Sequence, residues 1–193
     1  MRRIIVGLFI LFLVGCTTQV KQPIITDKKP TLSTREQFAA QNYWTAKGRF
    51  AVTQETKGIQ ANFHWEQKGD ETALHLWGPF GTGRVSIIQR GNSVRLEEAN
   101  GKVTYAKTPE TLIKQVTGWA IPVSGLRYWL RGLPLPDSSE RKIYLESGLI
   151  PVLNQSGWQI RYQPSDNTET FAPKRVELQF QNIRLKILVS EWQ

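Results

Sequence analysis

Alternation of apolar and polar side chains along most of the chain constrains its fold more than any other feature. Between Trp44 and Val52 every second residue is apolar or glycine, and most of the residues between them are polar. The same period of two recurs in residues 59–66, 74–76, 85–87, 94–96, 103–105, 158–162, 176–180 and 185–189. This period is typical of antiparallel strands with one buried face and one face in water. The sequence therefore predicts a mainly β protein, and Asn100-Gly101 predicts a type I′ hairpin turn.

Between residues 108 and 134 the period changes from that of a strand to that of a helix. Thr108-Pro109 supplies an N-cap followed by proline at the first helical position, and Gly118 suits a left-handed C-cap. A second short helix is expected after Pro122. Its apolar face carries Leu126, Trp129 and Leu130, and Arg127 and Arg131 lie off that face. Because strands resume near residue 143, this order predicts an antiparallel sheet curled over a helical insertion.

The N-terminus has the layout of a secretory signal. Arg2 and Arg3 precede an apolar run over residues 4–14, which is shorter than the about 20 residues that a membrane-spanning helix needs. The run ends in Leu13-Val14-Gly15-Cys16, which resembles the lipobox of bacterial lipoproteins. The resemblance implies cleavage before Cys16, diacylation of its thiol and acylation of the new amino group. The alternative is a cysteine buried in an ordinary signal peptide.

Three regions are expected along the chain. They are a signal peptide (residues 1–15), a lipidated N-terminus with a flexible tether (residues 16–32) and a single folded domain (residues 33–193). The capping-box spacing of Ser33 and Glu36 predicts a short helix at the start of the domain, with Phe38 and Ala39 facing inward. In bacterial lipoproteins, Asp after the acylated cysteine favours the inner membrane. Thr17 in that position therefore points to the outer membrane.

Charge and motif content exclude several classes of function. The formal net charge of +9 favours acidic partners or anionic lipid headgroups, although a solvated basic surface is the simpler interpretation. No RNA-binding motif or basic cluster indicates a nucleic-acid partner. The only histidines, His64 and His75, have the parity of surface residues, and adjacent Glu97 and Glu98 point to opposite faces of a strand. Neither an enzyme, a metal site nor a cofactor is expected, and a lipid hydrolase would lack its catalytic triad.

Bulky apolar residues are numerous for a domain of this size, and they include seven tryptophans. They can simply fill a core, since aromatic side chains bury large areas. A curled sheet under a helical lid can instead enclose an apolar cavity, which would suit acyl chains. The candidate cavity residues are Trp44, Phe50, Phe63, Trp65, Leu74, Leu76, Val85, Ile87, Leu126, Trp129 and Leu130.

A loop of unusual composition joins two of the expected strands. It contains Gly78, Pro79, Phe80 and Gly81, and glycine and proline shape tight turns. Phe80 has no strand partner in this pattern, so two interpretations are open. It folds back over the edge of the sheet, or it is an exposed apolar finger that enters a bilayer or the cavity of a partner.

Several segments resemble the LolB family of lipoprotein receptors. Gly78-Pro79-Phe80-Gly81 resembles the Asn-Pro-Leu-Gly loop of that family. Residues 117–122, Thr-Gly-Trp-Ala-Ile-Pro, are similar to its Thr-Gly-x-x-Ile-Pro segment, and residues 126–134 are similar to its Leu-x-x-Trp-x-x-Gly-Leu-Pro segment. Phe80 keeps the bulk and apolar character of the family's usual Leu, whereas Gly78 replaces Asn.

The resemblance implies a fold and a function. The expected fold is an open antiparallel β-barrel of about 11 strands with a helical lid. The expected function is a monomeric receptor, lipid-anchored in the inner leaflet of the outer membrane, that accepts lipoprotein acyl chains from the soluble carrier LolA and places them among outer-membrane phospholipids. Phe80 would enter the membrane. The alternative is a structural or adaptor lipoprotein with a filled core that binds a protein partner by its surface.

Overall fold

The computed structural model describes residues 25–26, 33–136, 144–145, 151–163 and 172–193. The predicted signal peptide, the predicted acylation site Cys16 and the expected start of a strand near Ile143 lie outside these residues. Within the predicted tether only Ile25–Thr26 (β1) is described, and it pairs with Tyr144–Leu145 (β8).

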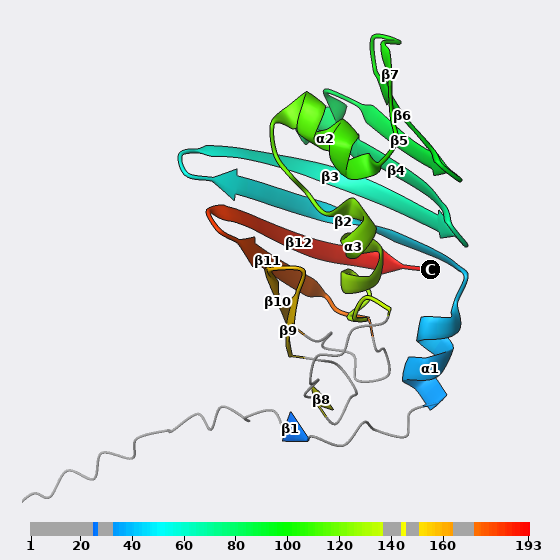
Figure 1. Ribbon diagram of the computed structural model, residues 1–193, viewed down its shortest axis with the longest axis vertical. Coiled ribbons are helices and arrows are strands. Elements are labelled where there is room, and N and C mark those ends of the chain that lie inside the picture. Colours follow the sequence, from blue (N-terminus) through cyan, green and yellow to red (C-terminus); the bar gives the residue numbers. More distant parts are fainter. Residues whose placement is uncertain (1–24, 27–32, 137–143, 146–150, 164–171) are drawn as a thin grey trace, which may run out of the picture.

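Ten antiparallel strands form a single curved sheet (Figure 1). In spatial order they are β7 (Val103–Ala106), β6 (Ser93–Glu98), β5 (Val85–Arg90), β4 (Glu71–Trp77), β3 (Lys57–Lys68), β2 (Tyr43–Gln54), β12 (Ile183–Trp192), β11 (Arg175–Phe180), β10 (Trp158–Gln163) and β9 (Val152–Gln155). The edge strands β7 and β9 do not pair with each other, so the barrel is open. This confirms the predicted mainly β fold.

In the described part of the chain, three α-helices accompany the sheet: α1 (Ser33–Ala40), α2 (Pro109–Thr117) and α3 (Val123–Trp129). The hydroxyl of Thr108 accepts a hydrogen bond from the Thr111 amide at the start of α2. Gly118 ends the helix with φ of 78°, a left-handed conformation that glycine adopts freely. Both predicted caps are therefore confirmed. In Figure 1, α2 and α3 lie over the concave face of the sheet, and we call the segment 109–129 the lid.

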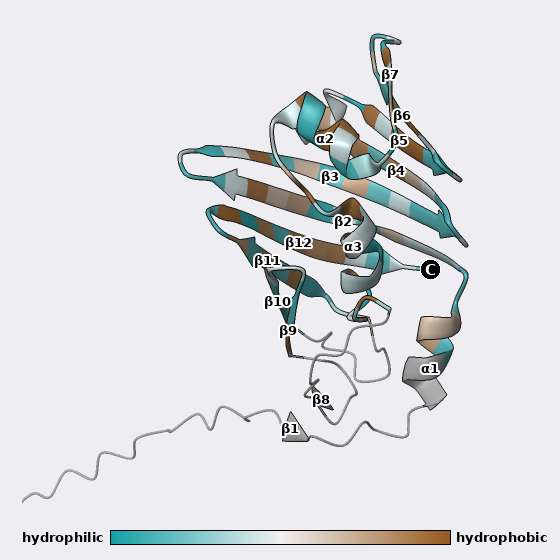
Figure 2. Cartoon of the chain, in the orientation of Figure 1, coloured by the Kyte–Doolittle hydropathy of each residue, from teal (hydrophilic) through white to brown (hydrophobic). Residues whose placement is uncertain are grey.

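The concave face carries the core because alternate residues of each strand point to it. Trp44, Ala46 and Val52 of β2 are buried, as are Phe63 and Trp65 of β3. Figure 2 shows the resulting alternation of hydrophobic and hydrophilic residues along the central strands. Buried residues of the lid and of β9 to β12 join the same cluster, so the described part of the domain has one continuous core.

The turn between β6 and β7 differs from the prediction. The Gly101 amide donates to the Glu98 carbonyl and the Glu98 amide donates to the Lys102 carbonyl, which encloses a three-residue loop. Only Gly101 in this loop has a positive φ, of 83°, whereas a type I′ turn would also need one at Asn100. The predicted type I′ turn is thus wrong. The Asn100 side chain accepts from the Lys102 amide at 2.9 Å, a local bond that suits the observed turn.

Arg131 is buried, with only 5% of its surface exposed, although the helical pattern placed it on a polar face. Its guanidinium lies over the rings of Phe38 (4.6 Å) and Trp44 (5.5 Å) and donates a hydrogen bond to the Phe38 carbonyl. Burial lowers the pKa of Arg131 to about 10, and nearby Arg127 acts in the same direction. Arg131 thereby attaches α1 to the chain that leaves the lid. Of the two α1 residues expected to face inward, Phe38 packs on the core and Ala39 is exposed.

Gly48 leaves no room for a side chain, because a Cβ atom there would lie 2.1 Å from the Leu188 carbonyl oxygen and 2.9 Å from the Phe63 ring. Gly48→Ala should lower the free energy of unfolding by about 1 to 3 kcal/mol, as overpacking does in cores. Chemical denaturation monitored by circular dichroism measures this change. Gly58→Ala in β3 is the control, since its Cβ would meet no atom closer than 3.3 Å. Equal losses in both variants would contradict this role of Gly48.

Candidate functional site

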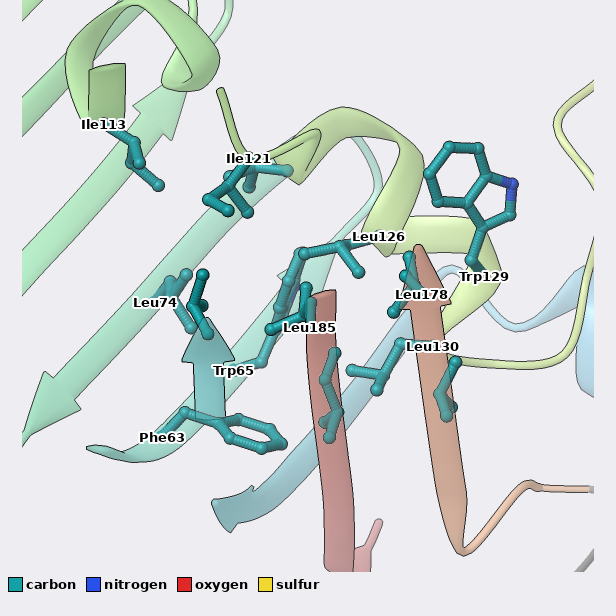
Figure 3. Close-up of a cluster of buried hydrophobic side chains, with 14 of the residues drawn as sticks. Phe63, Trp65, Leu74, Ile113, Ile121, Leu126, Trp129, Leu130, Leu178 and Leu185 are labelled. Atoms are coloured by element: carbon teal, nitrogen blue, oxygen red, sulfur yellow. The ribbon is translucent and has the colours of Figure 1, made fainter. Parts of the chain in front are cut away.

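The concave face and the lid enclose an apolar cavity of about 230 Å³. Its lining comes from strands β2 to β6, from β12 and from the lid. The lining residues are Phe50, Val52, Ile59, Ala61, Phe63, Trp65, Leu74, Leu76, Trp77, Gly78, Gly83, Val85, Ile87, Leu96, Ile113, Val116, Thr117, Trp119, Ile121, Val123, Leu126, Leu130, Leu185 and Ile187. Thr117 is the one polar side chain among them. Figure 3 shows several of these side chains converging from the sheet and the lid.

The lid covers the sheet only in part. Ile59 and Val116 line the cavity yet remain 45% and 47% exposed, so apolar surface continues to the outside. A cavity of about 150 Å³ lined by Leu, Ile and Phe already binds a benzene-sized ligand. The larger cavity here can therefore hold a flexible apolar ligand, and its wall offers nearly no hydrogen-bonding groups to a polar one.

Nine of the eleven predicted cavity residues line the cavity. They are Phe50, Phe63, Trp65, Leu74, Leu76, Val85, Ile87, Leu126 and Leu130. Trp44 and Trp129 do not, and these two assignments are corrected. Trp44 lies under Arg131 and stacks on Trp65 with ring centroids 5.7 Å apart.

Trp129 points away from the cavity because its position on α3 faces another part of the core. Its Nε1 donates to the Gln155 side chain of β9 at 2.9 Å. Figure 3 shows the Trp129 ring directed away from Leu74 and Ile121, whereas Leu126 lies toward them. Its ring packs against Gly125, where a Cβ would lie 2.7 Å from it.

The linker between α2 and α3 supplies two lining residues that the sequence analysis did not assign to the cavity, Trp119 and Ile121. They are buried, and alternate residues of this irregular segment point inward. The alternation of Trp119 and Ile121 is visible in the sequence. Because it lies between two helical patterns, the sequence analysis interpreted this segment only as a family motif. Trp77 at the end of β4 was missed for a similar reason, since it borders the loop rather than the alternating run.

Phe80 lies in a short 3₁₀ turn, Pro79–Gly81 (η1), at the mouth of the cavity. Its exposure of 105% shows that it does not fold back over the edge of the sheet. The Gly78 amide donates a hydrogen bond to the Thr82 carbonyl at 2.7 Å, and the Thr82 hydroxyl donates one to the Pro79 carbonyl at 2.9 Å. We call residues 78–83 the Phe80 loop. Gly78 and Gly83, at its two ends, line the cavity.

The backbone of Phe80 is in the left-handed region, with φ of 58° and ψ of 21°. Such a conformation costs a residue with a side chain about 1 to 2 kcal/mol. Strained conformations of this kind concentrate at functional sites. At Phe80 this unfavourable backbone conformation coincides with a fully exposed aromatic side chain.

Polar groups of the described residues form no recognisable catalytic arrangement. His64 and His75 lie opposite each other on neighbouring strands, with ring centroids 6.2 Å apart, and His75 Nδ1 is 2.9 Å from the Ser86 hydroxyl. In the part of the chain that the structure describes, no group of three His, Cys, Asp or Glu side chains could hold a metal ion. The Tyr162 hydroxyl is buried, and burial raises its pKa.

Over the same described residues, no helix has the length and apolar character needed to cross a membrane.

Comparison with known proteins gives matches over nearly the whole chain. Relatives described as outer-membrane lipoprotein LolB include one from Nitrosococcus oceani, 34% identical over 98% of this chain and 96% of its own length. Another, from Chromohalobacter salexigens, is 31% identical over 99% of this chain and 90% of its own length. A solved LolA superfamily protein from Nitrosomonas europaea shares the fold, with a TM-score of 0.50 at 8% identity over 84% of this chain and 94% of that chain.

The family profile described as outer membrane lipoprotein LolB matches residues 42–192, which span the whole curved sheet and the lid. With that match and the relatives above, the chain belongs to the LolB family of outer-membrane lipoproteins.

Proposed function

We propose that this protein is a non-enzymatic receptor that accepts lipoproteins from a LolA-like periplasmic carrier and releases them into the outer membrane. The observation that carries the proposal is an apolar cavity of about 230 Å³ whose mouth borders a loop with a fully exposed phenylalanine. The cavity would hold acyl chains, and the Phe80 loop would bring the cavity mouth to the bilayer.

Acyl chains fit the chemistry of the cavity. Each buried CH₂ group contributes about 0.8 kcal/mol, and this gain needs apolar surface but no polar contact. The lining has that character, since aliphatic and aromatic side chains of the sheet and the lid face each other across the cavity. A site of this kind holds lipid anchors irrespective of the protein sequence attached to them.

Transfer needs no chemical energy if each step leads to a more favourable site for the acyl chains. The protein would bind them more favourably than the carrier does, and the bilayer would bind them more favourably still. A ligand distributes between sites by differential affinity alone. A partly open cavity serves this purpose better than a sealed one, because the chains must also leave it.

The receptor is expected to act as a monomer held in the inner leaflet by lipid on Cys16, after removal of residues 1–15. Residues 16–32 would tether the domain to that anchor, and residues 33–193 would form the lipid-binding domain. Several acyl chains on one cysteine hold a protein firmly on a membrane. The Phe80 loop can then reach the same bilayer repeatedly.

Brominated fatty acid should quench the intrinsic fluorescence of the protein, because Trp65, Trp77 and Trp119 line the cavity. Trp119→Phe should reduce the absolute loss of fluorescence on addition of the brominated fatty acid. Trp129→Phe is the matched control and should leave that absolute loss unchanged, since Trp129 faces Gln155 instead of the cavity. Steady-state fluorescence titration measures both. Absence of quenching at saturating fatty acid would favour the alternative, an adaptor lipoprotein with a filled core.

Phe80→Glu should leave the free energy of unfolding within about 0.5 kcal/mol of the original, since the side chain is exposed. Acceptance of lipoprotein from the carrier should persist. Delivery to liposomes should fall at least tenfold, because a carboxylate in the bilayer centre costs about 2.5 to 3.5 kcal/mol. Phe80→Leu, the control, should deliver nearly normally. A thermal melt and a liposome-delivery assay test this, and either a large loss of stability or unchanged delivery would refute the role of Phe80.

Cys16→Ser should block lipidation and maturation, because the chain has no other thiol. Radiolabelled palmitate should be incorporated into the original protein and not into the variant. Normal incorporation into the serine variant would show that the lipobox assignment is wrong.

A further inference from the structure

A second depression lies beside the Phe80 loop and shares Phe50, Ala61 and Ile187 with the lining of the apolar cavity. It has a volume of about 550 Å³ and is lined by side chains of β2, β3, β11 and β12 together with Pro79. Most of these side chains are on the polar, convex face of the sheet. We call it the basic groove, after Arg49, Arg175 and Lys186 in its wall.

The strand register brings the three cations together. Arg175 pairs with Leu188, and Leu188 pairs with Arg49, so the two arginines lie in one row across three strands. Neighbouring strands are about 4.8 Å apart, which puts the two Cα atoms roughly 10 Å from each other. Both long side chains can therefore reach a single small anion between them. Lys186 lies in the next row, opposite Glu177 and Ala51.

The positive charge of the groove is largely uncompensated. Glu177 is the one carboxylate in the wall, and its Oε1 lies 3.9 Å from the Lys186 ammonium. Arg49 and Arg175 make no ion pair with any described residue, and both are exposed. By contrast, Arg90 and Arg95 elsewhere in the sheet each have a glutamate within 4 Å. Two guanidinium groups free to bind in one groove suit a phosphate, which arginine recognises by paired hydrogen bonds.

Pro79 belongs to the wall of the groove, and Phe80 is the next residue. When Phe80 enters the hydrocarbon of a bilayer, the groove necessarily lies near the level of the headgroups. Resting on the proposed membrane role of Phe80, we propose that the basic groove binds the phosphodiester of an anionic phospholipid in the target bilayer, with Arg49 and Arg175 as its ligands.

A net-anionic headgroup fits this groove better than a zwitterionic one. A choline or ethanolamine group would bring a cation next to Arg49, Arg175 and Lys186, whereas the glycerol of phosphatidylglycerol would not. Its neutral hydroxyls can instead contact Gln60 and Asn62, which line the groove on the β3 side.

Chemical footprinting of Lys186 tests the proposal. The acylated full chain is reconstituted into vesicles of phosphatidylcholine alone or mixed with phosphatidylglycerol, and lysine acetylation is measured by mass spectrometry. Phosphatidylglycerol should protect Lys186 but not Lys102, which lies near the β6–β7 turn. Arg49→Gln with Arg175→Gln should remove this protection, since each basic residue near an anionic surface changes its affinity about fivefold.

The double variant Arg90→Gln with Arg95→Gln removes the same charge from other strands and should keep the protection. Equal protection of Lys186 in both kinds of vesicle would overturn the proposal. So would protection by free glycerol phosphate without phosphatidylglycerol, which would indicate a site for soluble anions.

Delivery to pure phosphatidylcholine vesicles separates this proposal from the function on which it rests. Arg49→Gln with Arg175→Gln should deliver normally there, whereas Phe80→Glu should fail in both kinds of vesicle. If the double arginine variant instead fails to accept lipoprotein from the carrier, the groove is a protein-docking site and the headgroup proposal is overturned. A thermal melt confirms that the double variant is folded.

Discussion

The apolar concave face of the sheet is the constraint on which the rest of the molecule depends. Ten strands in one curved layer present more inward-facing apolar surface than two short helices can cover. The sheet does not close on itself, since β7 and β9 are separate edges. The lid therefore buries part of this face and leaves the remainder as a cavity with a partly exposed rim. Incomplete coverage of the concave face by the lid is thus a result of the architecture.

Much of the architecture follows from residue patterns because burial on one face of a strand repeats every second residue. The alternation in β2 predicts that Trp44, Ala46 and Val52 point to the buried face of the strand. The caps of α2 were equally predictable, since Thr108, Pro109 and Gly118 each suit one terminal position for a local reason. The exposure of Phe80 could not be decided, because the pattern of a loop does not specify which way its side chain turns.

The errors at Arg131 and Trp129 have a common physical cause, which is tertiary contact across long sequence separations. Arg131 was assigned to a polar face, but the rings of Phe38 and Trp44 and the Phe38 carbonyl provide it with a buried site. Trp129 was assigned to the cavity, but Gln155 on a distant strand offers its indole a hydrogen bond. Neither partner can be identified from helical periodicity. The same limitation applies to the basic groove, where the cations meet only through the register of β11, β12 and β2.

The hydrogen bonds that hold the Phe80 loop have a consequence for how the protein stays dispersed in water. These bonds preorganise the backbone on both sides of Phe80, so little backbone conformational entropy would be lost if the side chain entered a bilayer. Full burial of one phenylalanine contributes only about 1.5 to 3 kcal/mol. A stable protein–protein contact instead buries at least about 1,000 Å². In the proposed function, one exposed aromatic side chain would therefore be enough to enter a bilayer to which the protein is already attached, and too little to hold two copies of the protein together.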